Sequence, residues 1–244
     1  MEIKVELHTH TKYSHDSLLN KWMYLLMLKI KKINVVAITD HNEIKGAKKF
    51  QPFLEKYGIK VILGEEVFST RGEIIGLFLN KKIPAGLSPR ETMVRIKEQG
   101  GIVYIPHPYD EKRYKTVLAE EEIRANNDLI DIIEVHNGRN IKPYFSDNQL
   151  AIAQKYRKVM SVGSDAHTIF ELGRNYNVMK EFDNGLEFYN SLKEARFVKK
   201  ECLQIAHSIT KVDRVIRMIR KGNFNELFRI INKRYSRKYK KASK

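Results

Sequence analysis

The sequence contains a series of short apolar runs, each ending in side chains that can bind a metal ion. Residues 3–7 alternate apolar and charged side chains and lead into His8-Thr9-His10, whose two imidazoles extend from the same side of the strand. Later runs end in the same way, at 35–38 before Thr39-Asp40-His41, 61–63 before Gly64-Glu65-Glu66, 102–105 before Pro106-His107, 132–133 before Glu134-Val135-His136, and 160–162 before Asp165 and His167. Only His207 of the eight histidines lies outside such a strand end, so the pattern predicts one site assembled from many strands.

Segments with helical periodicity separate these runs. Apolar spacing predicts helices at residues 18–33, 43–57, 119–126, 143–156 and 185–194, and Ser88-Pro89-Arg90-Glu91 begins another with a capping box and a proline in the first turn. Residues 74–79 are expected to form an additional, antiparallel strand. Strand and helix alternate at least six times, which favours a closed or nearly closed α/β barrel because a barrel brings many strand ends to one point. The first strand is followed by no glycine-rich phosphate loop, which disfavours a Rossmann fold.

The net charge of +16 is concentrated at the C-terminal end. Residues 211–244 contain thirteen Lys and Arg against Asp213 and Glu226, a net +11 that leaves +5 for the first 210 residues. We expect a barrel domain over residues 1–195 and a basic helical extension over 196–244, because residues 211–220 and 224–235 place apolar side chains on one helical face. Such an excess of positive charge suits nucleic acid.

Cysteine usage and hydropathy indicate a cytoplasmic protein. The single cysteine, Cys202, cannot form an internal disulfide and suits a reducing compartment. The longest apolar stretch, residues 22–30, contains a lysine and is too short to cross a bilayer. We expect no signal peptide before the first strand and no membrane association.

The motifs and their order resemble the polymerase and histidinol phosphatase (PHP) family of metal-dependent phosphoesterases. The resemblance covers roughly residues 1–175 and implies a distorted (β/α)7 barrel holding two or three divalent ions (Zn, Mn or Fe). It implies one ion on His8, His10, Glu66 and Asp165, a second on Glu66 and His107, and a third among Asp16, His41 and His167. A shared glutamate makes physical sense, because two neighbouring cations repel unless an anion lies between them.

Some residue roles remain open at this point. Many family members carry a histidine on the strand after the bridging glutamate, where this chain has Ile75, so the second ion could be weak, absent, or completed by His136 or water. His15 is a second candidate beside Asp16 for the third position. Asp40 is expected to orient His41 or cap the next helix rather than bind metal.

The resemblance implies hydrolysis of a phosphate ester by a metal-bound hydroxide. Arg139 follows a strand end and is expected to bind phosphate and act in catalysis with His167, while Arg113 and Lys112 are weaker phosphate-binding candidates. The basic extension favours a nucleotide-derived or oligonucleotide phosphate as substrate, and nucleic acid as a partner. Two alternatives are a histidinol-phosphatase-like enzyme and a non-catalytic nucleic-acid-binding module on a decayed barrel.

Overall fold

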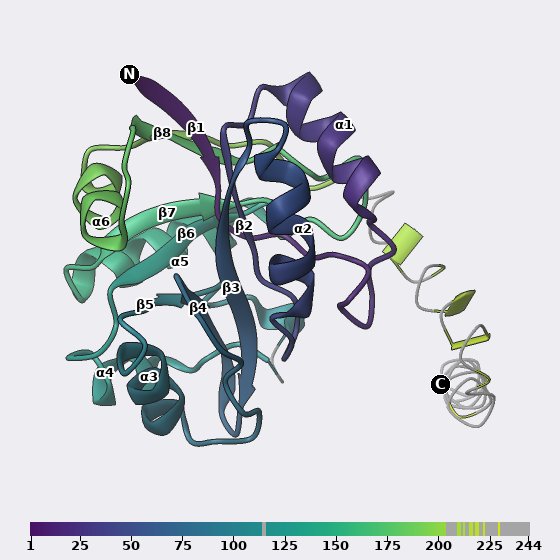
Figure 1. Cartoon of the computed structure of the whole chain (residues 1–244). Helices are drawn as coiled ribbons and strands as arrows, with labels where there is room; N and C mark the ends of the chain where they lie inside the picture. Colours follow the sequence, from purple (N-terminus) through teal and green to yellow (C-terminus); the bar gives the residue numbers. More distant parts are fainter. Residues whose placement is uncertain are drawn as a thin grey trace.

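The computed structural model describes residues 1–113 and 116–203, together with residues 209, 210, 212, 215, 216, 218, 219, 222 and 229. The side chain of Lys112 is not described. Apart from these single positions, the helices predicted at 211–220 and 224–235 and the basic extension lie outside the described residues. The described part is a mixed α/β structure (Figure 1).

The strands form one nine-stranded sheet in the order β7-β6-β5-β4-β3-β2-β1-β8-β9. They are β1 (Glu2–Glu6), β2 (Val35–Ile38), β3 (Lys60–Ser69), β4 (Gly72–Leu77), β5 (Ile102–Ile105), β6 (Ile132–Asn137), β7 (Val159–Gly163), β8 (Tyr176–Lys180) and β9 (Arg196–Val198). Strands β1 to β3 are parallel, as are β5 to β7, and β4 pairs antiparallel between the two groups. The antiparallel strand predicted at residues 74–79 is therefore confirmed, with observed bounds of Gly72–Leu77.

The sheet curves into a nearly closed barrel, with Asn177 of β8 joining its two sides. The Asn177 side chain accepts a hydrogen bond from the Val162 N–H at 3.1 Å. Its amide donates to the carbonyl oxygens of Val162 at 2.9 Å and Val5 at 3.2 Å. A backbone bridge between Thr9 and Ala166 continues this closure past the strand ends. The distorted barrel predicted from the sequence is confirmed, and its sheet extends through β9, three residues past the boundary expected at residue 195.

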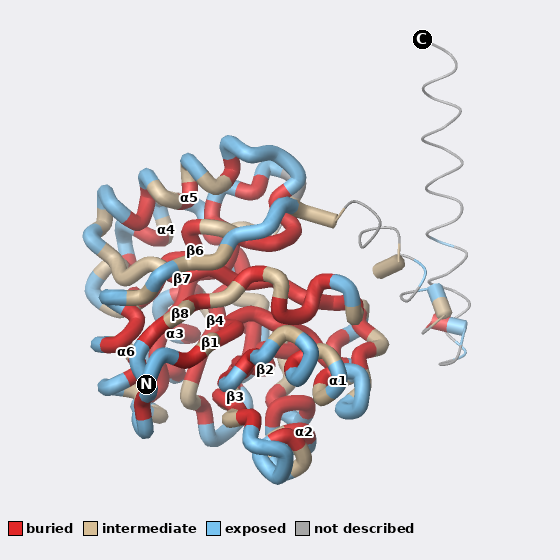
Figure 2. The backbone as a smooth tube through the Cα atoms, turned by 90° about the horizontal axis from the view of Figure 1, so that it is seen from above, coloured by how far each residue is buried: buried red, intermediate tan, exposed pale blue. Residues whose placement is uncertain are grey.

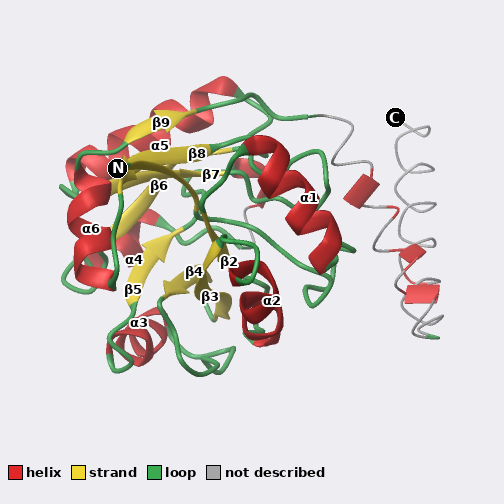
Figure 3. Cartoon of the chain, turned by 45° about the horizontal axis from the view of Figure 1, so that its top comes forward, coloured by secondary structure: helices red, strands yellow, loops and turns green. Residues whose placement is uncertain are grey.

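The helices lie on the outside of the sheet (Figures 1 and 3). They are α1 (Lys21–Lys31), α2 (Lys45–Glu55), α3 (Pro89–Lys97), α4 (Glu120–Ala125), α5 (Pro143–Lys155) and α6 (Gly185–Lys193), with a short 3-10 turn at Glu111–Arg113. The predicted capping box is present at Ser88 and Glu91. Among the described residues, each helix is too short or too polar to span a bilayer.

Two apolar layers stabilise this arrangement. One lies between the sheet and its outer helices, where Phe50 and Leu54 of α2 pack in the same cluster as Val36 and Ile38. The other lies inside the barrel and includes side chains of α6. Figure 2 shows the strands buried and the outer sides of the helices exposed. Because apolar side chains fill the barrel interior, polar side chains can gather only at its ends.

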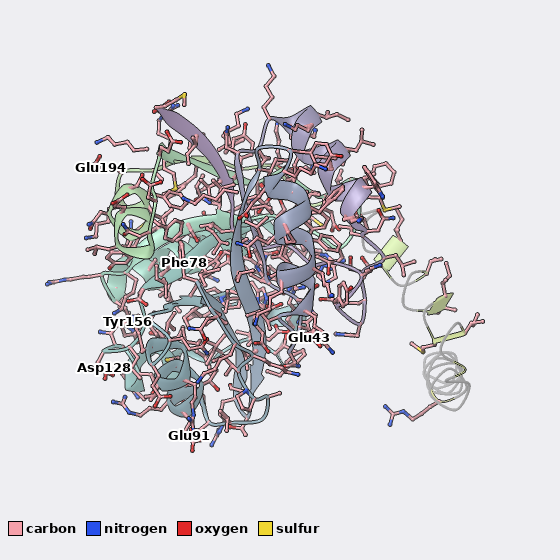
Figure 4. All side chains as sticks on the ribbon, viewed as in Figure 1. Glu43, Phe78, Glu91, Asp128, Tyr156 and Glu194 are labelled. Atoms are coloured by element: carbon pink, nitrogen blue, oxygen red, sulfur yellow. The ribbon has the colours of Figure 1, made fainter. Side chains whose placement is uncertain are left out.

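Charged pairs on the outer surface lie apart from the polar centre described below. Figure 4 shows Glu91, Asp128 and Glu194 at the periphery of the molecule. Asp128 pairs with Arg90 at 3.0 Å, and Glu194 pairs with Lys180 at 2.8 Å. Exposed pairs of this kind contribute little to stability because water screens them.

Candidate metal centre

Eight predicted ligands meet at the carboxyl ends of the barrel strands. Six are buried, and Asp16 and His41 are half-buried. Each of the eight has an imidazole nitrogen or carboxylate oxygen within 4 Å of another member of the group. They are His8, His10, Asp16, His41, Glu66, His107, Asp165 and His167.

The four side chains assigned to the first ion lie at distances that suit ligands of one cation. Nε2 of His8 lies 3.5 Å from Glu66 Oε2 and 3.6 Å from Asp165 Oδ1. Nε2 of His10 lies 3.4 Å and 3.2 Å from the same two oxygens. Four ligands placed tetrahedrally at about 2.0–2.2 Å from zinc are separated by roughly 3.3–3.6 Å. All four atoms are buried without a hydrogen-bond partner, which is costly unless a cation binds them. The donor set therefore fits a divalent metal.

Glu134 of β6 is a buried carboxylate that holds His8 in place. It accepts hydrogen bonds from His8 Nδ1 at 3.1 Å, and from the Tyr104 hydroxyl, the His107 N–H and the Asn137 side chain at 2.8 Å each. Because a carboxylate only accepts, His8 carries its proton on Nδ1 and turns the Nε2 lone pair toward the centre. Burial acts to raise the pKa of Glu134, but the neighbouring His8 and the hydrogen bonds outweigh it and lower this pKa. The sequence pattern placed Glu134 among the strand-end side chains but did not indicate that it holds His8.

Asp40 organises the loop after β1 and does not face the centre. Its carboxylate accepts hydrogen bonds from the Thr11 N–H and hydroxyl, both at 2.6 Å, and from the Ser14 hydroxyl at 2.9 Å. Ser14 Oγ in turn accepts from His10 Nδ1 at 3.1 Å and from the His41 N–H at 3.0 Å. His10 consequently presents Nε2 to the centre, and Asp40 occupies the position expected of an orienting residue.

Glu66 directs its two carboxylate oxygens to different sides. Oε2, which faces the first position, also lies 3.0 Å from His41 Nδ1. Oε1 lies 3.2 Å from His107 Nε2. This is the arrangement required of a carboxylate shared by two cations.

Glu73 of β4 also reaches the centre, although the sequence analysis did not include it. Its Oε1 lies 3.6 Å from His41 Nδ1, and its Oε2 lies 3.4 Å from His107 Nε2. Burial, together with repulsion from Glu66, raises the pKa of Glu73 well above its usual value. The available signal was the two-residue spacing from Ile75, since side chains at that spacing share one face of a strand.

Asp16, His41 and His167 meet at the third predicted position. Asp16 Oδ2 lies 3.2 Å from His167 Nε2 and 3.7 Å from His41 Nε2. Nδ1 of His167 donates to the Asp165 carbonyl oxygen at 2.8 Å, which leaves Nε2 directed at Asp16. Burial acts to raise the pKa of Asp16, but His167 and the other imidazoles hold it well below its usual value. His15 Nε2 lies 3.6 Å from the same carboxylate, with 51% of its side chain exposed.

His136 lies away from these ligands. Its Nε2 donates to the Lys200 carbonyl oxygen at 3.2 Å, and its Nδ1 accepts from the Ser146 hydroxyl at 2.8 Å. It lines a different cavity, of about 310 Å³, beside the start of α5. The structure therefore does not bring His136 to the metal ligands.

Two of the predicted phosphate-binding residues line a cavity of about 720 Å³ above the ligands. Arg113 contacts Asp165 Oδ2 at 2.6 Å and Asp110 at 3.0 Å. Arg139 contacts Glu171 at 3.2 Å. Burial acts to raise the pKa of Asp165, but Arg113 and the imidazoles outweigh it and hold this pKa well below its usual value.

The backbone is unusual where two of the strands end. His107 has φ +30° and Asp165 has φ +51°, which side-chain-bearing residues seldom adopt. Before Asp165, a Cβ added to Gly163 would lie 2.6 Å from the His8 Cβ and 2.5 Å from Glu134 Oε1. Glycine at this position therefore lets β7 approach β1, and the strained residues are held where their side chains meet the other ligands.

Comparison with known proteins identifies the family. The PHP domain model matches residues 6–243. An uncharacterized protein of Methanocaldococcus jannaschii is 38% identical over 205 residues, which cover 78% of this chain and 79% of the relative. A second uncharacterized protein of the same organism is 48% identical over 117 residues, covering 44% of this chain and 68% of the relative.

Solved structures share the fold at low sequence identity. PsfC from Pseudomonas syringae has a TM-score of 0.62 at 14% identity, covering 89% of this chain and 98% of its own. A proposed metal-dependent phosphoesterase from Bifidobacterium adolescentis (TM-score 0.57) and an amidohydrolase from Chromobacterium violaceum with bound sulfate and no metal (TM-score 0.56) are each 17% identical and cover 67% of this chain and 87% of their own. With the family match extending over nearly the whole chain, this protein belongs to the PHP domain family.

Proposed function

We propose that this protein is a metal-dependent hydrolase that cleaves a phosphate ester, with nucleotide-derived or short oligonucleotide phosphates as its substrate class. The observation that carries the proposal is a group of buried imidazole and carboxylate atoms without hydrogen-bond partners, lying below a cavity lined by two arginines. Imidazole and carboxylate ligands suit Zn, Mn and Fe. When bound, such cations supply an activated water and neutralise charge on the phosphoryl oxygens.

The side chains around the cavity position the substrate. Arg113 and Arg139 line the cavity with their guanidinium groups. A guanidinium group can bind two phosphate oxygens at once, as it binds the two oxygens of a carboxylate. The cavity of about 720 Å³ lies within the roughly 300–1,000 Å³ typical of small-molecule sites, which favours a nucleotide-sized substrate.

His167 is the candidate proton donor on the cavity wall. Burial acts to lower its pKa, but Asp16 outweighs it and raises this pKa above the ordinary value. In this role His167 holds its proton on Nε2 beside Asp16, facing the cavity, which requires that the third cation position is empty during the reaction.

The test is phosphate release by the full-length chain after metal removal and reloading with Mn²⁺, Zn²⁺ or Fe²⁺. Substrates are p-nitrophenyl phosphate, nucleoside monophosphates, nucleoside 3′,5′-bisphosphates and short oligonucleotides. We expect metal-dependent release that is lost in His8→Ala/His10→Ala and retained in His136→Ala, which removes an imidazole outside the ligand group. Equal rates in wild type and the double variant, or no release from any substrate, would refute the proposal.

We also propose that the basic segment 211–244 adds sequence-independent affinity for nucleic acid. Its net +11 supports this, because lysine and arginine contacts to phosphates release counterions and dominate such binding. Replacing Lys233, Arg234, Arg237 and Lys238 with glutamine should weaken oligonucleotide binding and reduce its dependence on salt. Unchanged affinity and salt dependence would contradict this role.

A further inference from the structure

We propose that Glu73 is a ligand of the second cation position, where the family resemblance implied a histidine at the place of Ile75. This inference rests on the proposed function, because it requires the same metal centre. It assigns a coordinating role to a residue that the motif pattern left out, and it changes the expected metal preference of that position.

Strand register places Glu73 on the face that carries the other ligands. In the antiparallel pair of β3 and β4, Glu66 is opposite Ile75 and Phe68 is opposite Glu73. Directly opposite residues project to the same side of the sheet, and that side alternates along each strand. All four side chains therefore point into the barrel. Ile75 is fully buried in the inner apolar cluster. Glu73 is the next residue of β4 that points into the barrel, and with Phe68 it lines the cavity.

Glu73 and Glu66 span the same two imidazoles. Glu66 reaches His41 Nδ1 at 3.0 Å with one oxygen and His107 Nε2 at 3.2 Å with the other. Glu73 does the same at 3.6 Å and 3.4 Å. Ligand atoms of His41, Glu66 and Glu73 all lie within 4.8 Å of one another. Two buried carboxylates at this separation repel each other, and a cation between them and His107 removes the repulsion.

The backbone around Glu73 fixes its position. The Glu73 N–H donates to the Thr116 carbonyl oxygen at 2.6 Å. Gly72 has φ +144°, and a Cβ added there would lie 2.6 Å from the backbone of Leu118. The turn into β4 is therefore packed against the segment after β5, and Glu73 is held where its carboxylate reaches His107.

The donor types imply different preferences at the two positions. The first position offers two imidazoles and two carboxylates. The second offers the carboxylates of Glu66 and Glu73 with Nε2 of His107, and Nδ1 of His41 lies near both carboxylates. Carboxylate oxygen favours harder cations such as Mn²⁺ and Mg²⁺, whereas imidazole suits Zn²⁺. Exchanging the implied histidine for Glu73 therefore shifts the second position from Zn²⁺ toward Mn²⁺.

The test measures metal content and affinity of the full-length chain, independently of catalysis. Glu73→Gln keeps the side-chain shape and removes the charge. Glu65→Gln is the matched control. Glu65 is a buried glutamate next to Glu66 in the sequence, but it belongs to none of the ligand groups described above and accepts a hydrogen bond from the Ile83 N–H at 2.9 Å. We expect Glu73→Gln to lose one equivalent of Mn²⁺ or to bind it at least tenfold more weakly, and Glu65→Gln to bind as wild type.

Glu73→His should restore one equivalent and shift its Zn²⁺ to Mn²⁺ affinity ratio at least tenfold toward Zn²⁺. Circular dichroism and thermal melting of the metal-free proteins establish whether the variants fold. If Glu73→Gln does not fold, Glu73→Asp replaces it, and we expect Glu73→Asp to bind Mn²⁺ more weakly than wild type. Unchanged stoichiometry and affinity in the folded variant overturn the inference. A wild type that binds this equivalent through Glu73 but hydrolyses no phosphate ester upholds the inference and refutes the proposed function.

Discussion

Replacing Glu134 with glutamine should weaken both the metal centre and the fold. The Glu134 side chain is fully buried, with Oε1 accepting from His8 and Tyr104 and Oε2 accepting from His107 and Asn137. Glutamine keeps one oxygen and places an NH₂ group, which cannot accept, at the other position. Whichever way the amide turns, two of the four donors lose their acceptor.

The size of the effect follows from these contacts. A buried donor left without an acceptor costs about 1–3 kcal/mol, so two of them should lower the free energy of unfolding by about 2–6 kcal/mol. The loss of the carboxylate behind His8 should also reduce metal affinity about 10–100-fold, as is typical for the partner of a metal-binding histidine. That reduction corresponds to about 1.4–2.7 kcal/mol of binding free energy.

The two effects are measured separately. Urea unfolding of the metal-free proteins gives the stability change, and competition with a chelator of known affinity gives the metal affinity. Glu65→Gln serves again as the buried-carboxylate control and should leave metal affinity unchanged. A Glu134→Gln variant whose metal affinity stays within twofold of wild type would refute the role assigned to the carboxylate behind His8.

Three further predictions concern the supports of the centre. Gly46→Ala, which would normally favour a helix by about 1 kcal/mol, should instead lower the melting temperature, because its Cβ would lie 1.8 Å from Asp40 Oδ2; an increase would contradict this. Asn177→Ala should lower the urea-unfolding free energy by about 2–5 kcal/mol, because it leaves buried backbone groups between β1 and β7 unpaired, and a loss below 1 kcal/mol would count against that bridge. The hydrogen bond from Lys155 lowers the pKa of Glu120 from 4.5 to about 2, so this carboxylate stabilises the fold above about pH 4.5 and loses that contribution as pH falls toward 2. Between pH 5 and pH 2, the melting temperature of Glu120→Gln should therefore fall less steeply with pH than that of wild type. An identical slope in the two proteins would contradict this role of Glu120.

The sequence by itself determined the order of strands and helices and the residue types at the strand ends. The period-two pattern of residues 3–7 identifies the strand that carries His8 and His10, and the capping box at Ser88 is local because its partner lies three residues away. The predicted ligands meet because parallel strands in a barrel end at one rim, so local patterns sufficed to group them.

Only the tertiary structure decided the contacts that depend on which strands become neighbours. His8 and Glu134 are 126 residues apart, and their hydrogen bond exists because the barrel nearly closes between β1 and β7. The place of Glu73 beside His107 depends on the register of β3 and β4, in which Glu66 is opposite Ile75. A sequence pattern specifies which face of a strand a side chain occupies, whereas its partner across the barrel depends on strand order and register, which hydrophobic periodicity does not encode.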